Sequence, residues 1–168
     1  MGRNNTITKQ INIMKKIDLD FMAKLNIKLL QACEFGAIDE LKEAIEAGAN
    51  SNCRDGNATA LHLACRYSHP DIVEYLIGAG VNVCVLDNRL CTPLHYACGV
   101  HAVDKHPKHN EIVEMILYVA PCVTKYVNMK NANYYTALDL AYENGYEEIA
   151  TLLINVGAEA TFNKYRFK

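Results

Sequence analysis

A short pattern recurs along the chain at nearly regular intervals. It reads TALHLAC from Thr59, TPLHYAC from Thr92 and TALDLAY from Thr136. The first two copies are 33 residues apart, and the third follows after 44 residues, which is one period plus 11. An earlier copy, LLQACEFGAIDELKEAIEAGANSN from Leu29, lacks the threonine but keeps the alanine and the cysteine. One unit of this length buries little apolar surface alone, so neighbouring units are expected to stack.

Each copy has the features of two helices joined by a turn. The threonine is suited to cap the first helix, and Pro93 is suited to the first helical position. Leu61, Ala64 and Cys65 fall on one helical face, which we expect to be buried. A second segment with Ile, Val and Leu at helical spacing follows in every copy. Glycine or proline is predicted to end each second helix: Gly48, Gly80, Pro121 and Gly157.

The pattern T-P-L-H-x-A with a period of 33 resembles the ankyrin repeat. The resemblance covers about residues 26–160 and implies an all-α solenoid of about four helix-turn-helix repeats, with connecting β-hairpin loops and an N-terminal capping helix. The segment IDLDFMAKLNIKLL supplies that predicted cap. The predicted organisation is a disordered basic N-terminus (1–16), an ankyrin-repeat domain (17–160) with repeats at about 26–54, 55–87, 88–131 and 132–160, and a basic C-terminal tail (161–168).

Charge and cysteine usage narrow the class of partner. Residues 1–28 carry a net charge of +4, residues 29–160 carry −9 and residues 161–168 carry +3. The acidic body argues against nucleic-acid binding. The sequence has no apolar run of about 18 residues, so no membrane-spanning helix is expected. The seven cysteines form no CxxC pair, which favours reduced thiols. We therefore expect a cytoplasmic protein, or one in the host cytosol if it is a secreted effector.

Catalytic signatures are missing from the sequence. It contains no glycine-rich phosphate loop, no GxSxG and no HExxH. His62 and His95 lie inside the repeat pattern, and the resemblance implies that they hydrogen-bond between neighbouring repeats. The sequence therefore predicts a non-enzymatic monomer without a cofactor that binds another protein as an adaptor, inhibitor or targeting subunit. A regulator of an enzyme, or a minor enzyme that uses a surface cysteine, is the alternative from another class.

The resemblance implies that a partner binds to variable side chains on the first helices and on the loop tips, which together form the concave face. Aromatic and arginine side chains often dominate binding energy at protein interfaces. Tyr134 stands where the family pattern has a turn glycine. For Phe35 and Tyr67, packing beneath the loops is an equally open interpretation. The predicted partner-binding residues are Phe35, Arg66, Tyr67, Asn88, Arg89, Asn133, Tyr134 and Tyr135.

The third repeat carries an insertion, GVHAVDKHPK, in place of a three-residue turn. With its edge it holds His101, His106 and His109, spaced H-x4-H-x2-H. Histidine binds zinc and titrates near neutral pH, so a metal- or pH-responsive module based on residues 99–109 is a second functional alternative. Structural zinc sites usually have tighter paired spacing, and added loop residues cost little stability. We predict an exposed loop without metal that extends the recognition edge.

Two further hypotheses follow from the sequence. Asn52 and Asn128 occupy a loop position that resembles the hydroxylated asparagines of other ankyrin proteins, whereas Cys84 occupies it in the second repeat. The many Asn, Ile and Lys residues are typical of AT-rich genomes. A third alternative is therefore a host-directed effector of an intracellular bacterium or a large virus that acts through the same kind of binding.

Overall fold

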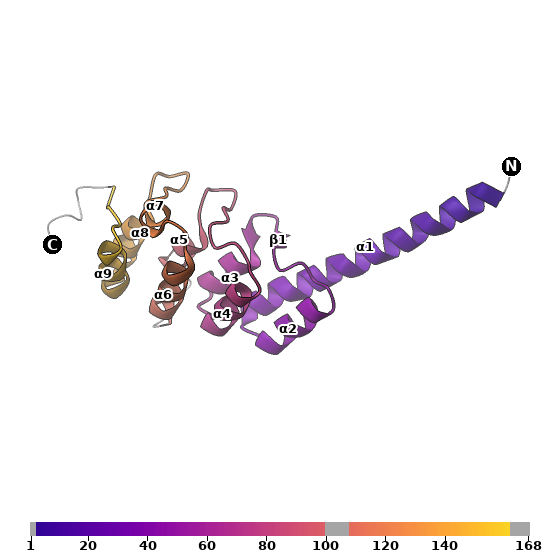
Figure 1. The fold of residues 1–168 in the computed structure, drawn as a ribbon, viewed down its shortest axis with the longest axis horizontal. Helices are drawn as coiled ribbons and strands as arrows, with labels where there is room; N and C mark the ends of the chain where they lie inside the picture. Colours follow the sequence, from indigo (N-terminus) through magenta and orange to yellow (C-terminus); the bar gives the residue numbers. More distant parts are fainter. Residues whose placement is uncertain (1–2, 100–107, 162–168) are drawn as a thin grey trace.

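The computed structural model describes residues 3–99 and 108–161, with the backbone alone for residues 3–14. Helices account for most of these residues, and two short strands form one hairpin (Figure 1). The elements are α1 (Arg3–Phe35), α2 (Ile38–Glu46), β1 (Arg54–Asp55), β2 (Ala58–Thr59), α3 (Ala60–Arg66), α4 (Pro70–Gly78), α5 (Pro93–Ala97), α6 (His109–Val119), α7 (Val123–Val127), α8 (Ala137–Asn144) and α9 (Glu147–Asn155).

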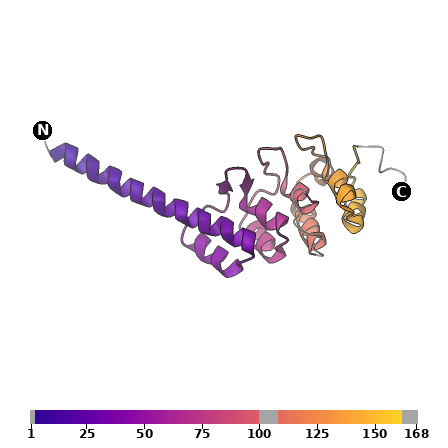
Figure 2. The same cartoon turned by 180° about the vertical axis from the view of Figure 1, so that it is seen from behind.

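The helices stack in antiparallel pairs along the long axis of the molecule. The pairs are α1/α2, α3/α4, α5/α6 and α8/α9, and each helix contacts its counterpart in the next pair. The connecting loops all project to the same side of the stack (Figures 1 and 2). This arrangement is the predicted all-α solenoid of four repeats.

A continuous core runs between the helix layers. The leucines of the three repeated patterns, Leu61, Leu94 and Leu138, are 0%, 0% and 2% exposed, so they occupy equivalent buried places. The alanines three residues later are fully buried, and their small side chains let adjacent first helices pack closely. Each interior repeat therefore completes the core of its two neighbours.

Three of the second helices end just before the predicted glycines. Gly48, Gly80 and Gly157 have φ values of 101°, 78° and 88°, a region that side chains disfavour. In each case the next residue donates its backbone N–H to a carbonyl five residues back, as Val81 does to Leu76 at 3.1 Å. These bonds satisfy carbonyls that the helix end would otherwise leave without a partner.

The histidine of the repeated pattern connects one repeat to the next. The backbone N–H of Thr59 donates to Nδ1 of His62 at 3.3 Å, so the ring proton resides on Nε2. That nitrogen donates to the carbonyl of Cys91 in the following loop at 3.0 Å. His95 repeats the arrangement with Thr92 and with the carbonyl of Tyr135, 3.2 Å away. Both rings are buried, and burial lowers their pKa because it disfavours the charged imidazolium.

The N-terminal helix is longer than the predicted cap. The cap was expected to begin near residue 17, whereas α1 is one helix from Arg3 to Phe35. No glycine or proline interrupts that range, and Gly36 follows with a φ of 75°. The last turns, which include Leu29 and Cys33, are buried against the stack. The earlier part projects away from it as a single rod (Figure 1).

The segment after Pro121 forms the short helix α7, which follows Cys122 in the left-handed region at a φ of 47°. Tyr126 of this helix is 3% exposed, and its hydroxyl donates to the carbonyl of Val83 at 2.8 Å. The helix α7 is therefore tied to the loop of the second repeat.

The described part of the chain contains no helix with the length and apolar character needed to cross a bilayer.

We expect Leu94→Ala to lower the free energy of unfolding by about 2–5 kcal/mol, because an interior repeat cannot close the cavity left behind. Ile154→Ala on α9 is the matched control, since that side chain is 49% exposed. Urea unfolding measures both variants. Equal small losses would show that Leu94 is not a core residue of the stack.

His62 should make stability depend on pH. Its pKa is lowered to about 4 by burial, against about 6.5 in an unfolded chain. As pH falls from 6.5 to 4, the unfolded chain takes up a proton that the folded chain does not, so stability decreases. The loss due to this residue should approach about 3 kcal/mol at pH 4. Urea unfolding across this window should give a shallower slope for His62→Gln; an unchanged slope would contradict the assignment.

Candidate protein-binding surface

Two loop tips, residues 87–91 and 131–135, adopt the same compact turn. Oδ1 of Asp87 accepts the backbone N–H groups of Arg89 and Cys91 at 2.8 and 2.7 Å. Oδ1 of Asn131 does the same for Asn133 and Tyr135 at 2.9 and 3.1 Å. These side chains replace the strand pairing that the first loop uses, where Arg54 pairs with Thr59. Among the described loops, only the first therefore contains the predicted β-hairpin strands.

The turn places bulky residues in the left-handed region. Leu90 has a φ of 58° and Tyr134 a φ of 67°, at equivalent positions of their loops. Their side chains are 50% and 72% exposed. Non-glycine residues pay a conformational cost there, and such strain is concentrated at functional positions. The loop edge therefore holds two strained, exposed, apolar side chains.

Hydrogen bonds join the loop tips into a row. Nη1 of Arg54 donates to the carbonyl of Leu86 at 3.0 Å, and Nδ2 of Asn88 donates to Oδ1 of Asn57 at 2.5 Å. Further along, the backbone N–H of Ala132 donates to the carbonyl of Arg89 at 2.7 Å. The row is thus a continuous wall along the concave face.

A groove of about 560 Å³ lies between this wall and the first helices of the last two repeats. Part of its lining comes from the loop wall and part from the ends of α5 and α8. The lining residues are Arg89, Cys91, Gly99, Asn131, Ala132, Asn133, Tyr135, Leu140, Glu143 and Asn144. Three of the predicted partner-binding residues, Arg89, Asn133 and Tyr135, therefore meet in one groove.

Gly99 explains why the groove lies at the third repeat. It has a φ of 113° and follows the C-cap residue of α5, so α5 ends at Ala97. The corresponding helix α3 continues to Arg66, and α8 continues to Asn144. The side chain of Asn144 lies across Gly99, since a Cβ atom there would fall within 2.6 Å of its Cγ atom. The early end of α5 thus leaves this place in the row of first helices to the side chain of Asn144, which forms part of the groove lining.

The other predicted residues lie near the first and second repeats. Phe35 is 75% exposed, so it does not pack beneath the loops. Tyr67 is half-buried, and its hydroxyl donates to Oε1 of Glu34 at 2.9 Å, while the Arg66 guanidinium lies 5.3 Å from its ring centroid. Burial and the contact with Glu34 raise the pKa of Tyr67. Tyr67 therefore has a structural role beside its predicted contact role.

The histidine insertion is only partly described. His101 and His106 lie outside the described residues. His109 is not part of an exposed loop, because it is the first residue of α6 and is 1% exposed. Its ring lies 5.5 Å from that of Tyr146, so it packs against the last repeat. No cluster of three or more His, Cys, Asp or Glu side chains suited to a metal exists within the described part of the chain.

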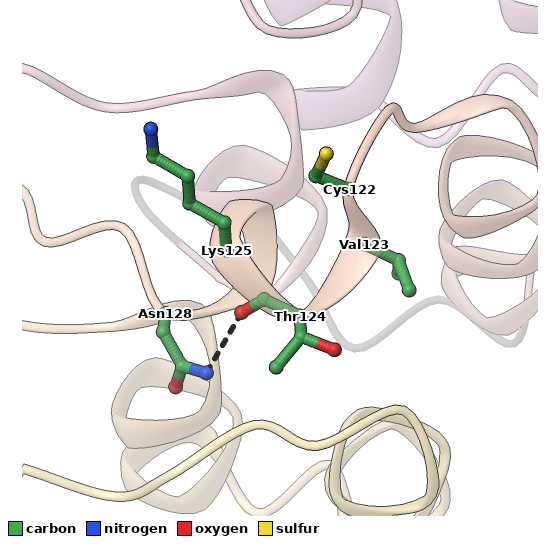
Figure 3. Close-up of a pocket in the computed structure, with 5 residues that line it drawn as sticks. All are labelled: Cys122, Val123, Thr124, Lys125 and Asn128. Carbon is green, nitrogen blue, oxygen red and sulfur yellow. Dashed lines mark hydrogen bonds between the residues drawn. The ribbon is translucent and has the colours of Figure 1, made fainter.

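A second depression lies beside α7, lined by Cys122, Val123, Thr124, Lys125 and Asn128 (Figure 3). The side chain of Asn128 is already engaged there. Its Nδ2 donates to the carbonyls of Thr124 and Gly157, both at 2.8 Å, and its Oδ1 accepts the backbone N–H of Glu159 at 2.7 Å. These bonds join α7 to the end of the last repeat. The other predicted hydroxylation position, Asn52, is exposed on its loop.

Comparisons with known proteins agree with this architecture. The family model for ankyrin repeats (3 copies) matches residues 29–120. The chain belongs to the ankyrin-repeat family. NF-kappa-B inhibitor alpha of Homo sapiens is 34% identical over 105 residues, which are 60% of this chain and 30% of that protein.

Two other relatives extend the match further along the chain. Transient receptor potential cation channel subfamily A member 1 of Homo sapiens is 27% identical over 125 residues, covering 74% of this chain and 10% of that protein. The B-cell lymphoma 3 protein homolog of Mus musculus is 26% identical over 158 residues, covering 91% and 33%. This chain therefore spans a third or less of the length of these relatives.

Sequence reasoning selected the loop side of the groove and missed its helix side. The predicted contact residues did not include Gly99, Glu143 or Asn144. Gly99 and Glu143 occupy the repeat position of Arg66, and Asn144 occupies that of Tyr67. The available signal was Gly99 itself, because a glycine at a first-helix position favours an early end of the helix.

Replacing Tyr134 by glycine should relieve strain in the third loop. We expect the free energy of unfolding to stay unchanged or to rise by up to about 1 kcal/mol, since glycine tolerates this φ but also gains freedom in the unfolded chain. Asn133→Gly is the control in the same turn and should destabilise by about 0.5–1 kcal/mol. Urea unfolding compares the two. An equal loss for both would mean that the Tyr134 side chain stabilises the fold.

Proposed function

We propose that this protein binds a partner protein through its concave face and acts as an adaptor, an inhibitor or a targeting subunit. Family membership makes the chain a protein–protein interaction module. The observation that carries the finer proposal is the groove beside the loop wall, whose tips also hold the strained and exposed Leu90 and Tyr134. A rigid wall of this kind limits the ordering cost that binding must overcome.

Exposed anchors extend this surface along the stack. Phe35, Leu90 and Tyr134 are 75%, 50% and 72% exposed, and Arg89 lies beside the last two in the loop wall. Large apolar and arginine side chains supply most of the energy at protein interfaces when they enter pockets of the partner. An extended concave surface that offers several such side chains suits a folded partner or a long segment of one.

The five buried thiols are suited to the core and not to catalysis. Burial raises the pKa of Cys33 to about 12, that of Cys53 to about 11 and that of Cys91 to about 11, and it raises the pKa values of Cys65 and Cys98 still further. The thiolate is the nucleophile in cysteine chemistry, so these protonated groups are poor nucleophiles. They serve instead as small apolar side chains in the core.

The relatives support regulation by binding. One of them is named as an inhibitor of NF-kappa-B. We propose by analogy that the chain works by covering or positioning a surface of its partner, without chemistry of its own.

The test is affinity capture with the intact chain, followed by titration of the recovered partner. We expect the double variant Arg89→Ala, Tyr134→Gly to weaken binding at least about tenfold, which corresponds to about 1.4 kcal/mol. Tyr118→Ala is the control, because Tyr118 is 91% exposed on α6. Its affinity should match that of the unmodified chain. A partner that binds the double variant normally but loses affinity for the control would place the binding surface elsewhere.

A further inference from the structure

We propose that the groove bounded by Arg89, Gly99 and Glu143 binds an extended peptide segment of the partner, with one lysine or arginine side chain of that segment against Glu143. This inference rests on the proposed function, since it assumes that the concave face is the binding face. It adds the backbone conformation and the charge of the segment that is recognised.

The first argument is access. The short helix α5 ends at Ala97, just before Gly99, and the side chain of Asn144 covers Gly99 and forms the floor of the groove there. Neighbouring first helices continue past this level on both sides. The early end of α5 leaves room beside the loop wall for a polypeptide backbone, which would lie against the amide of Asn144. A bulky folded element would instead be kept out by the loop wall.

The second argument is hydrogen bonding. Nδ2 of Asn144 donates to the carbonyl of Leu140 at 2.8 Å and to that of Cys98 at 3.4 Å, and these bonds fix the side chain. Its Oδ1 accepts no hydrogen bond from the described residues. The side-chain amide of Asn133 likewise has no partner among them. A side-chain amide offers one acceptor and up to two donors, which match the N–H and C=O groups of a peptide.

A peptide in an extended conformation has backbone N–H and C=O groups that are available for these hydrogen bonds. In a helix or a paired strand, the backbone N–H and C=O groups are already bonded to one another. An extended single segment presents them alternately to both sides. The two amides of the groove, one on the loop wall and one on α8, therefore suit such a segment.

The third argument is charge. Glu143 lines the groove, is exposed, and forms no ion pair within residues 3–99 and 108–161. The body of the chain, residues 29–160, has a net charge of −9, so an acidic segment would be repelled. Arg89 on the facing wall disfavours a segment with many basic residues. One lysine or arginine beside Glu143, in a segment that is otherwise uncharged, therefore fits the charges of both walls.

A selection from a phage-displayed library of random dodecapeptides on the full chain tests this inference. We expect the enriched peptides to share a lysine or arginine. One of them, made synthetically, should bind Glu143→Gln about fivefold and Glu143→Lys more than about tenfold more weakly than the unmodified chain. Tyr118→Ala should bind it normally. Glu143 is exposed, so melting of both variants should match the parent and exclude a folding defect.

A second variant addresses the hydrogen bonds. Asn133→Leu keeps the size of an exposed side chain but removes its amide, and it should weaken the same peptide. Failure to enrich any peptide, enrichment of peptides without a basic residue, or undiminished binding to Glu143→Gln would each overturn the inference. The proposed function would survive those results if the natural partner still required Arg89 and Tyr134.

Discussion

The bond from the histidine of one repeat to the loop of the next is the interaction on which the rest of the structure depends. His62 connects Thr59 of its own helix start to the carbonyl of Cys91, and His95 connects Thr92 to that of Tyr135. Both acceptor residues directly follow the loop tips. One buried side chain thus fixes three features at once: where a helix begins, how two repeats stack, and where the next loop projects.

The last repeat shows why this position changes from histidine to aspartate. Its Asp139 accepts the backbone N–H of Thr136 at 2.8 Å, as the histidines do, but its other oxygen accepts the N–H of Thr161 at 2.8 Å. In the earlier repeats the group to be reached is a backbone carbonyl, so the connecting side chain must donate a hydrogen bond. In the last repeat it is the backbone N–H of Thr161, so the side chain must accept one. The substitution keeps the connection and reverses its direction.

Periodic features of the structure could be predicted from the sequence, and interrupted ones could not. The buried leucines, the glycine helix ends and the loop edge all follow from positions that recur every 33 residues. The lengths of α1 and α5 depend on single departures from the repeat. The polar start of α1 favoured a disordered segment, although no residue in it breaks a helix. His109 was grouped with the insertion because of its spacing to His106, whereas its burial comes from a neighbour 37 residues away, Tyr146.

The candidate site is built from those departures. Tyr134 and Leu90 stand where glycine would remove strain, and Gly99 stands where another residue would continue a helix. The left-handed Leu90 and Tyr134 cost stability, and the turns bear the cost because the side chains of Asp87 and Asn131 bond their backbones. Selection for stability alone would place glycine at both positions. Their chain neighbours Arg89, Cys91, Asn133 and Tyr135 line the groove at Gly99, on a scaffold whose buried positions otherwise follow the repeat. That coincidence is the physical reason to propose recognition at this part of the loop wall.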